Sequence, residues 1–188
     1  MPMPLKSDRF DLMHELKASN RQTLKRVGFG GGCHWCTEAV FQSLRGVTLV
    51  EQGWIASQAP YNNESEAVIV HYHPDTISLS DLISVHLCTH SSTSKHSMRK
   101  KYRSAVYYFD SADKTLIKNE ISKNQSEFNE AIITLTLPFA AFRLSPAQYQ
   151  NYFKKHHSRP FCKAYIHPKL QVLMQRYAHV YQAHDNIK

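Results

Sequence analysis

Three consecutive glycines at residues 30–32 separate a strand-like run from a helix-like run, and no other stretch constrains the fold as strongly. Residues 25–29 before them are expected to form a strand. Residues 34–45 after them repeat apolar side chains at helical spacing. Glycine lets the backbone turn tightly, and a helix that starts directly after the turn leaves its first N–H groups without partners. The junction therefore predicts a strand, a tight turn and a helix whose positive end is open.

Two cysteines, Cys33 and Cys36, stand at the start of this helix. A thiol at a helix N-terminus meets the positive end of the helix, which favours the thiolate. A second cysteine three residues on lies about one turn away, near enough for a disulfide. Free cysteines are also common as small buried apolar residues, but three glycines make little sense for packing alone. We therefore expect Cys33 to be a nucleophile and Cys36 to be a candidate resolving thiol.

Zinc binding is a competing interpretation, because a CxxC pair supplies two ligands. The remaining ligands would have to come from residues far along the chain: His86, Cys88, His90, His156, His157 and Cys162. No second pair among them has a tight ligand spacing. Thiol chemistry is therefore favoured, and no metal or other cofactor is expected.

The length of 188 residues suits one domain. We expect an N-terminal extension over residues 1–24 and a single catalytic domain over residues 25–188. No apolar run approaches the roughly 20 residues of a membrane span, and the start has no signal-peptide core. Four cysteines are too few for a disulfide scaffold, so a cytoplasmic protein without membrane contact is expected.

The net charge of +8 raises the question of an anionic partner. The positive residues are scattered, and only residues 99–101 and 154–155 form small clusters. No recognition motif accompanies the charge, so no nucleic-acid partner is expected.

The order of the expected elements predicts an α+β fold. Strands are expected at residues 25–29, 47–54, 66–72 and 103–109, and helices at 34–45 and 79–89. This βαββαβ order is typical of the ferredoxin-like plait, a plait-like α/β sandwich. The remaining chain predicts a helix at 112–127, a strand at 131–137, a helix opened by Ser145-Pro146 and a last amphipathic helix from Pro168. The sandwich should therefore carry C-terminal helices.

Three further kinds of side chain are candidates for the site. Tyr102, at the mouth of a strand, can donate a hydrogen bond to a ligand oxygen, although it also suits a plain sheet face. Glu64 and Glu66 lead the strand at 66–72, and a carboxyl near a thiolate can act as a general acid. Such glutamates are more often solvated. Trp35 and Trp54 suit either an apolar pocket or the core.

The stretch at residues 31–35, Gly-Gly-Cys-His-Trp, resembles the Gly-Gly-Cys-Phe-Trp motif of the peptide methionine sulfoxide reductase A family. The resemblance continues in order within residues 38–47, 66–68, 72–78, 102–105 and 160–170. It implies a plait-like fold, in agreement with the element order. It also implies an enzyme that reduces methionine S-sulfoxide, free or in oxidised proteins, through a cysteine sulfenic acid and a disulfide. Thioredoxin or another dithiol would reopen that disulfide.

The resemblance also implies roles for single residues. Cys33 matches the nucleophile, Trp35 matches the aromatic residue that holds the methyl group, and Tyr102 matches a tyrosine that binds the sulfoxide oxygen. Cys162 lies where many members keep a C-terminal resolving cysteine. Cys36 and Cys162 both remain candidates for resolution.

The chain departs from the family pattern around this site. His34 replaces the usual Phe, Cys36 the usual Gly, Trp54 a second oxygen-binding Tyr, and Ser97 an Asp. Part of the polar pocket is therefore expected to be rebuilt from His34, Ser97 or His96.

The segment that normally carries the acid, residues 61–66, is shortened. Glu64 is the nearest carboxyl there, with Glu38 as second choice. Two other classes of function stay open: a CxxC thiol–disulfide oxidoreductase on the same scaffold, and a non-catalytic zinc-stabilised binding protein.

Overall fold

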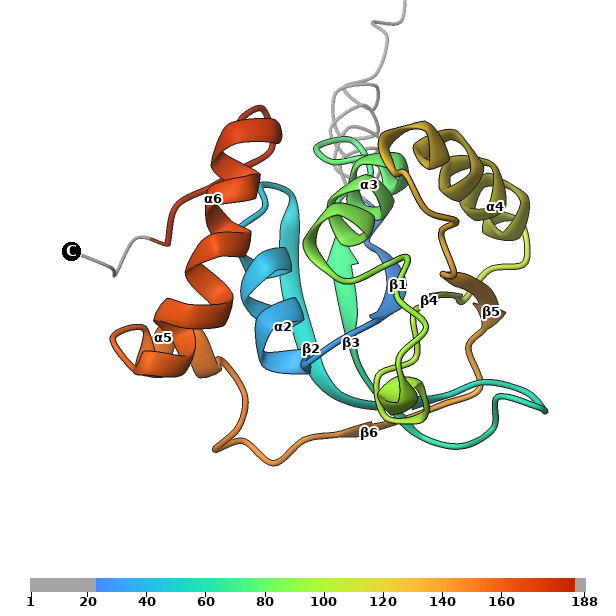
Figure 1. Cartoon of the computed structure of the whole chain (residues 1–188), viewed down its shortest axis with the longest axis horizontal. Coiled ribbons are helices and arrows are strands. Elements are labelled where there is room, and N and C mark those ends of the chain that lie inside the picture. The colour runs from blue at the N-terminus through green and yellow to red at the C-terminus, as the bar shows by residue number, and fades with distance from the viewer. Residues whose placement is uncertain (1–22, 185–188) are drawn as a thin grey trace, which may run out of the picture.

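The computed structural model describes residues 23–184, so the expected extension lies outside the described residues except for residues 23 and 24. Within this range, six strands form one sheet in the order β5-β4-β1-β3-β2-β6 (Figure 1). The strands are β1 Lys25–Gly30, β2 Val47–Ala56, β3 Ser65–Tyr72, β4 Ala105–Tyr108, β5 Leu135–Pro138 and β6 Ala141–Leu144. The helices are α2 His34–Gln42, α3 Leu79–Thr89, α4 Asp113–Asn124, α5 Tyr152–His156 and α6 His167–Arg176. Short 3₁₀ turns span Ser97–Lys100 and Gln125–Glu127, and a π-helical turn spans Cys162–Ile166.

The sheet is mixed, and its centre is antiparallel. β1 pairs with β3 on one side and β4 on the other, β2 pairs with β3 and with β6, and only β4 and β5 run parallel. The first elements follow the predicted order of strand, helix, strand, strand, helix, strand, and α3 has the predicted bounds 79–89. The α+β prediction is thus confirmed.

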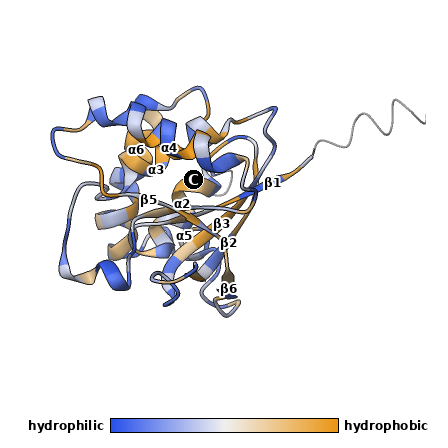
Figure 2. Ribbon diagram, turned by 90° about the vertical axis from the view of Figure 1, so that its right-hand side faces the viewer, coloured by the Kyte–Doolittle hydropathy of each residue, from blue (hydrophilic) through white to orange (hydrophobic). Residues whose placement is uncertain are grey.

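The two faces of the sheet carry separate apolar clusters. Because side chains alternate along a strand, Phe29 and Val68 point to the helices, whereas Ala67 and Tyr107 point to the other face. The helix face holds the larger cluster, to which every named helix contributes. The other face is covered by loops, with Phe139 among the packed residues. Hydrophobic stretches lie along β3 and the inner helices, and hydrophilic stretches lie on the outer loops (Figure 2).

The predicted helix opened by Ser145-Pro146 is wrong, because long-range hydrogen bonds hold residues 145–151 in turns. Ser145 donates its N–H to the Gln52 carbonyl at 2.9 Å, and the Gln52 side chain donates to the Tyr149 carbonyl at 2.9 Å. The side chain of Gln150 donates back to the Gln52 carbonyl at 2.7 Å. These bonds fix the segment beside β2, so the backbone does not continue as a helix.

The helix that does form, α5, begins at a buried carboxylate. Glu38 accepts the N–H groups of Asn151 at 2.7 Å and Tyr152 at 3.0 Å. Asn151 takes the left-handed conformation, with φ 57°, in which a short polar side chain is tolerated. Glu38 therefore serves as a helix-end acceptor in the core.

Several other predicted bounds differ. The strand expected at 131–137 begins only at Leu135, and β6 was not predicted. The helix expected at 112–127 divides into α4 and a 3₁₀ turn, and the helix expected at 34–45 ends at Gln42. Among the described residues, no helix combines the length and apolar character needed to cross a membrane.

Candidate active site

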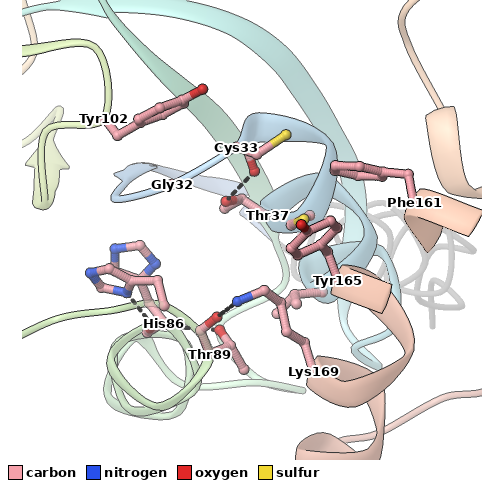
Figure 3. A pocket seen from close by; sticks show the side chains of 12 residues that line it. Gly32, Cys33, Thr37, His86, Thr89, Tyr102, Phe161, Tyr165 and Lys169 are labelled. Atoms are coloured by element: carbon pink, nitrogen blue, oxygen red, sulfur yellow. Dashed lines mark hydrogen bonds between the residues drawn. The ribbon is translucent and has the colours of Figure 1, made fainter. Parts of the chain in front are cut away.

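Cys33 is the N-cap residue of α2 and directly follows the glycine turn. Gly31 has φ 159°, and a Cβ there would lie 2.4 Å from a ring carbon of His90, so only glycine fits at this position. The Cys33 carbonyl accepts the N–H of Cys36 at 3.1 Å and the hydroxyl of Thr37 at 3.2 Å. The turn thus presents the half-buried Cys33 thiol at the start of the helix, as predicted (Figure 3).

The pKa values of Cys33 and Cys36 are shifted in opposite directions. The pKa of Cys33 is lowered, chiefly because the thiol of Cys36 donates a hydrogen bond to it; the N–H groups of Trp35 and Cys36 act in the same direction. Burial and the nearby charge of Glu66 oppose this shift. The pKa of Cys36 is raised, because its proton is held by Cys33 and because it is buried. Within this pair, Cys33 is therefore the thiol that ionises more readily, and Cys36 is the one that keeps its proton.

A buried carboxyl lies beside the start of the same helix. Glu66, on β3, is 5% exposed and accepts the N–H of His34 at 3.1 Å. The Lys101 ammonium lies 3.4 Å from its other oxygen. Its charge acts on Cys33, so the carboxyl and the thiol belong to one site. In the sequence, Glu66 stands out only as one of two glutamates at the start of this strand.

His34 is buried next to this carboxyl. Its Nδ1 lies 3.0 Å from the Gly53 carbonyl, which can only accept, so Nδ1 carries a proton. Its Nε2 then faces Glu66 Oε2 at 3.7 Å. Burial lowers the pKa of His34, while the Gly53 carbonyl and Glu66 oppose that shift. The neutral ring therefore turns an unprotonated nitrogen toward the carboxyl.

Tyr102 and Lys101 stand on the same side of Cys33. Tyr102 lines the cavity at Cys33, and the Lys101 ammonium lies 5.0 Å from the centre of the Tyr102 ring. The pKa of Lys101 is raised, first by the Tyr102 hydroxyl and then by Glu66. This side therefore combines a hydroxyl, an ammonium and a carboxyl.

The cavity that Tyr102 lines has a volume of about 320 Å³ and extends past Cys33 to α6. Phe161, Tyr165 and Lys169 form its wall from the π-helical turn and α6, and α3 closes the floor (Figure 3). The Lys169 ammonium donates to the Thr89 carbonyl. Burial lowers the pKa of Lys169, while the two thiols, Cys36 before Cys33, act to raise it. A half-buried cation thus shares this cavity with both cysteines.

Two stacked histidines lie beneath the glycine turn, with ring centres 4.1 Å apart. His86 contacts the Gly30 carbonyl at 2.9 Å, and His90 contacts the Ser104 hydroxyl at 2.8 Å. Burial lowers the pKa of His86 and lowers that of His90 to about 4. Nothing in the local sequence distinguishes them from surface histidines, since their burial depends on the packing of α3 under the turn.

The two tryptophans flank the site differently. Trp35 stacks on Tyr152 at 4.1 Å between ring centres and meets Phe161 edge-on at 5.7 Å. The Trp54 ring meets the His34 ring edge-on, with 5.8 Å between the ring centres. The Arg143 guanidinium lies 5.6 Å from the centre of the Trp54 ring. Both rings thus surround the start of α2, but neither lines the cavity that contains Lys169.

The structure does not bring Glu64 or Ser97 to the cavity. Glu64 is bound to Arg143 by three contacts of 2.5 to 3.2 Å, and this partner lowers its pKa. It precedes β3 and is exposed to solvent, so the expectation that Glu64 reaches Cys33 is wrong. Ser97 is exposed at the start of a 3₁₀ turn and does not rebuild the polar pocket.

The third cysteine of interest, Cys162, is fully buried in the core at the π-helical turn. Burial raises its pKa, and its charge acts on Cys36, so the two residues lie near each other. Between residues 23 and 184, no three His, Cys, Asp or Glu side chains are grouped as metal ligands. The zinc interpretation therefore finds no ligand set in this range.

Comparisons with known proteins agree on one family. A family model described as peptide methionine sulfoxide reductase matches residues 25–181. The chain is 34% identical over 165 residues to peptide methionine sulfoxide reductase MsrA of Deinococcus radiodurans, covering 79% of this chain and 80% of the relative. It is 31% identical over 160 residues to MsrA of Campylobacter jejuni, covering 79% and 97%.

Solved structures share the fold at lower identity. The reduced form of Mxr1 from Saccharomyces cerevisiae has a TM-score of 0.67 at 20% identity, covering 78% of this chain and 93% of that chain. Methionine sulfoxide reductase A of Corynebacterium diphtheriae has a TM-score of 0.62 at 20% identity, covering 73% and 77%. Mxr1 in complex with Trx2 has a TM-score of 0.56 at 20% identity, covering 71% and 87%.

Proposed function

This chain belongs to the peptide methionine sulfoxide reductase family, and we propose that Cys33 is the nucleophile with which it reduces methionine sulfoxide to methionine. The observation that carries the proposal is the position of this thiol, whose pKa is lowered, between a buried carboxyl and a cavity. Such a thiol is a ready nucleophile at neutral pH.

In the first step, the Cys33 thiolate attacks the sulfur of the sulfoxide. Glu66 transfers a proton to the sulfoxide oxygen, and the Tyr102 hydroxyl donates a hydrogen bond to it. The oxygen passes to the Cys33 sulfur, methionine leaves, and Cys33 becomes a sulfenic acid. The cysteine sulfur has then lost two electrons and the substrate sulfur has gained two.

Glu66 takes the role of the acid because its buried carboxyl is held at the start of α2 by the His34 N–H. His34 Nε2 faces this carboxyl, so His34 is placed to take up a proton from solvent at Nε2 and pass it to Glu66 after each turnover. This arrangement replaces the aspartate that the family has where this chain has Ser97.

Aromatic rings complete the proposed substrate pocket. Trp35 and Trp54 lie on either side of the start of α2, where they are placed to hold the methyl group of the substrate. A sulfoxide methyl group is small and apolar, so it gains from contact with rings that exclude water.

For the second step, we propose that Cys36 resolves the sulfenic acid. Its thiol already contacts Cys33, so the attack needs little movement. The Cys36 sulfur bonds to the Cys33 sulfur and water leaves. Cys162 stays the competing candidate, because it is buried close to Cys36.

An external dithiol, thioredoxin or a chemical equivalent, then opens the disulfide. When the dithiol attacks the Cys33 sulfur, Cys36 leaves as a thiolate. Burial opposes this ionisation, because it raises the pKa of Cys36. Lys169 shares the cavity with Cys36 and carries a positive charge that stabilises this leaving group. No metal or cofactor enters the scheme.

A second candidate function is thiol–disulfide exchange. The observation that favours it is the hydrogen-bonded thiol pair at a helix start, which by itself can reduce a disulfide. It predicts reduction of insulin by the protein as fast as reduction of a sulfoxide.

We further propose the plait-like class for the fold and a single catalytic domain over residues 25–188. The central strand order β4-β1-β3-β2, with both crossing helices on one face, supports the class. Four free cysteines suit a reducing compartment, and we propose the cytoplasm.

The test uses the purified chain with dithiothreitol and the two epimers of methionine sulfoxide, free and within a peptide. The proposal expects reduction of the S epimer only, together with slow insulin reduction. Insulin reduction without turnover of either epimer would replace the proposed function by the second candidate.

A further inference from the structure

Acidic residues are missing from two long stretches of the chain. Residues 82–109 and 131–184 contain no Asp or Glu, whereas all 15 acidic residues lie elsewhere. The same stretches contain twelve of the 23 Lys and Arg residues: Lys95, Arg99, Lys100, Lys101, Arg103, Arg143, Lys154, Lys155, Arg159, Lys163, Lys169 and Arg176. The net charge of +8 therefore has its source in two separate segments.

The fold places these two segments on opposite sides of the Cys33 cavity. The first supplies Tyr102 and the residues of α3 that line the cavity, and the second supplies Phe161 and Tyr165 (Figure 3). The helix that carries Cys33 lies between them. No Asp or Glu lines the cavity itself.

Lys169 lines the cavity, and three further cations lie within two residues, along the chain, of a lining side chain: Lys101 next to Tyr102, and Arg159 and Lys163 on either side of Phe161. We call these four cations the basic rim. Lys101 is bound to Glu66 and Lys169 to a carbonyl. Arg159 and Lys163 are exposed, and no described carboxylate lies within ion-pair distance of either. Their positive charge is thus free to act on a ligand.

Two other cations of the second segment are paired with carboxylates. Arg143 binds Glu64 at 2.5 Å, and Arg176 binds Glu127 at 2.9 Å. Both lie outside the cavity lining. Lys154 and Lys155 are exposed and outside ion pairs with described carboxylates as well, but Arg159 and Lys163 are the unpaired cations of this segment nearest in the chain to Phe161 and Tyr165. Tyr165 is 60% exposed.

We propose that this protein prefers methionine sulfoxide within acidic polypeptide segments, an inference that rests on the proposed function. The sulfoxide side chain enters at Cys33, while its neighbours along the substrate chain cross the basic rim. Negative side chains at those neighbouring positions meet unpaired cations, which concentrates and orients such substrates. A polypeptide is favoured over a nucleic acid as the anionic ligand, because only the polypeptide carries the sulfoxide.

The experiment compares three peptides that differ only in the residues flanking one methionine S-sulfoxide, which are Glu, Gln or Lys. The proposal expects kcat/KM to fall in the order Glu, Gln, Lys, by about tenfold in total at low salt. The difference should shrink as ionic strength rises to about 0.5 M, because salt screens exposed charges. Methyl p-tolyl sulfoxide, which is neutral and small, should show no such salt dependence.

Substitution of the two unpaired cations gives the second arm. Arg159→Glu with Lys163→Glu should abolish or invert the peptide preference while leaving methyl p-tolyl sulfoxide turnover unchanged. Lys114→Glu with Lys118→Glu is the matched control, because both are exposed on α4, far from α5 in Figure 1. This control should keep the preference for Glu.

Equal kcat/KM values for the three peptides would overturn the proposal, as would a preference that survives in the Arg159 and Lys163 variant. A single-stranded oligonucleotide that binds through these two residues, without any peptide preference, would assign the rim to nucleic acid instead. Loss of turnover with every sulfoxide would contradict the proposed function itself, which is a separate result.

Discussion

On the side of Cys33 that faces the sheet, the carboxyl of Glu66 is fixed by the His34 N–H and by Lys101. On the side that faces α3 and α6, the thiol of Cys36 shares a cavity with the ammonium of Lys169. One side holds groups that move protons onto oxygen, and the other holds groups that exchange sulfur bonds. The two half-reactions are therefore expected to depend on different residues, with Cys33 common to both.

Cys33→Ser should have the largest effect, because it removes the group that both sides act on. A serine hydroxyl is not ionised at neutral pH and does not form a sulfenic acid. We expect no detectable methionine from a sulfoxide and no disulfide after oxidation, measured by chromatography and by thiol titration. Turnover above a few per cent of the wild-type rate would assign the nucleophile elsewhere.

Glu66→Gln should act only on the side that faces the sheet. Loss of the proton donor to the developing oxyanion is expected to slow methionine release in a single turnover by about 100- to 1000-fold. Disulfide formation from Cys33 sulfenic acid made with hydrogen peroxide should keep its rate. Glu64→Gln is the matched control, because Glu64 is bound to Arg143 outside the cavity, and it should retain nearly full activity. The reverse pattern would restore Glu64 as the acid.

Tyr102→Phe should have a smaller effect on the same step, about 100-fold, because Glu66 and Lys101 remain. The ring is kept, so unfolding by urea should be unchanged. Stopped-flow measurement of the first turnover gives the rate. Wild-type kinetics in this variant would remove the Tyr102 hydroxyl from the site.

Acid should destabilise the folded protein, because burial favours the neutral form of His86 and His90, next to α2. The pKa of His90 is about 4 in the folded protein, below the ordinary value near 6.5. As pH falls below 6.5, the unfolded chain binds a proton before the folded chain does. The free energy of unfolding should therefore fall by about 3 kcal/mol for His90 between pH 6.5 and 4.

Urea unfolding at pH 7 and pH 4.5 measures this loss. His90→Gln should reduce the pH dependence, whereas His96→Gln, at an exposed position, should not. An equal slope in wild type and His90→Gln would show that the buried ring is not the cause.

The parts of the site that were predictable depend on local sequence. The glycine turn, Cys33 at the start of the helix and the bounds of α3 follow from residues within one or two turns of each other. Segment 145–151 was not predictable, because its shape depends on hydrogen bonds to Gln52, nearly 100 residues away. The preference of Ser145 and Pro146 for a helix start carries no information about those bonds.

The choice between Glu64 and Glu66 shows the same limit over a shorter distance. The two residues are alike in type and lie two positions apart, yet only Glu66 is inside β3, where it pairs with Trp54. This strand pairing holds Glu66 next to α2. Glu64 lies before the strand and forms an ion pair with Arg143 instead. A usable signal was present, since the family resemblance resumes at Glu66 rather than at Glu64.

The most direct test of the division around Cys33 is the disulfide that forms after one turnover. Reduced protein is mixed with one equivalent of methionine sulfoxide, alkylated, digested and analysed by mass spectrometry. The account predicts a Cys33–Cys36 bond as the first product, with Cys162 alkylated. In the Cys36→Ser variant, one methionine should form per protein and the Cys33 sulfenic acid should accumulate. A Cys33–Cys162 bond as the first product, with Cys36 alkylated, would contradict it.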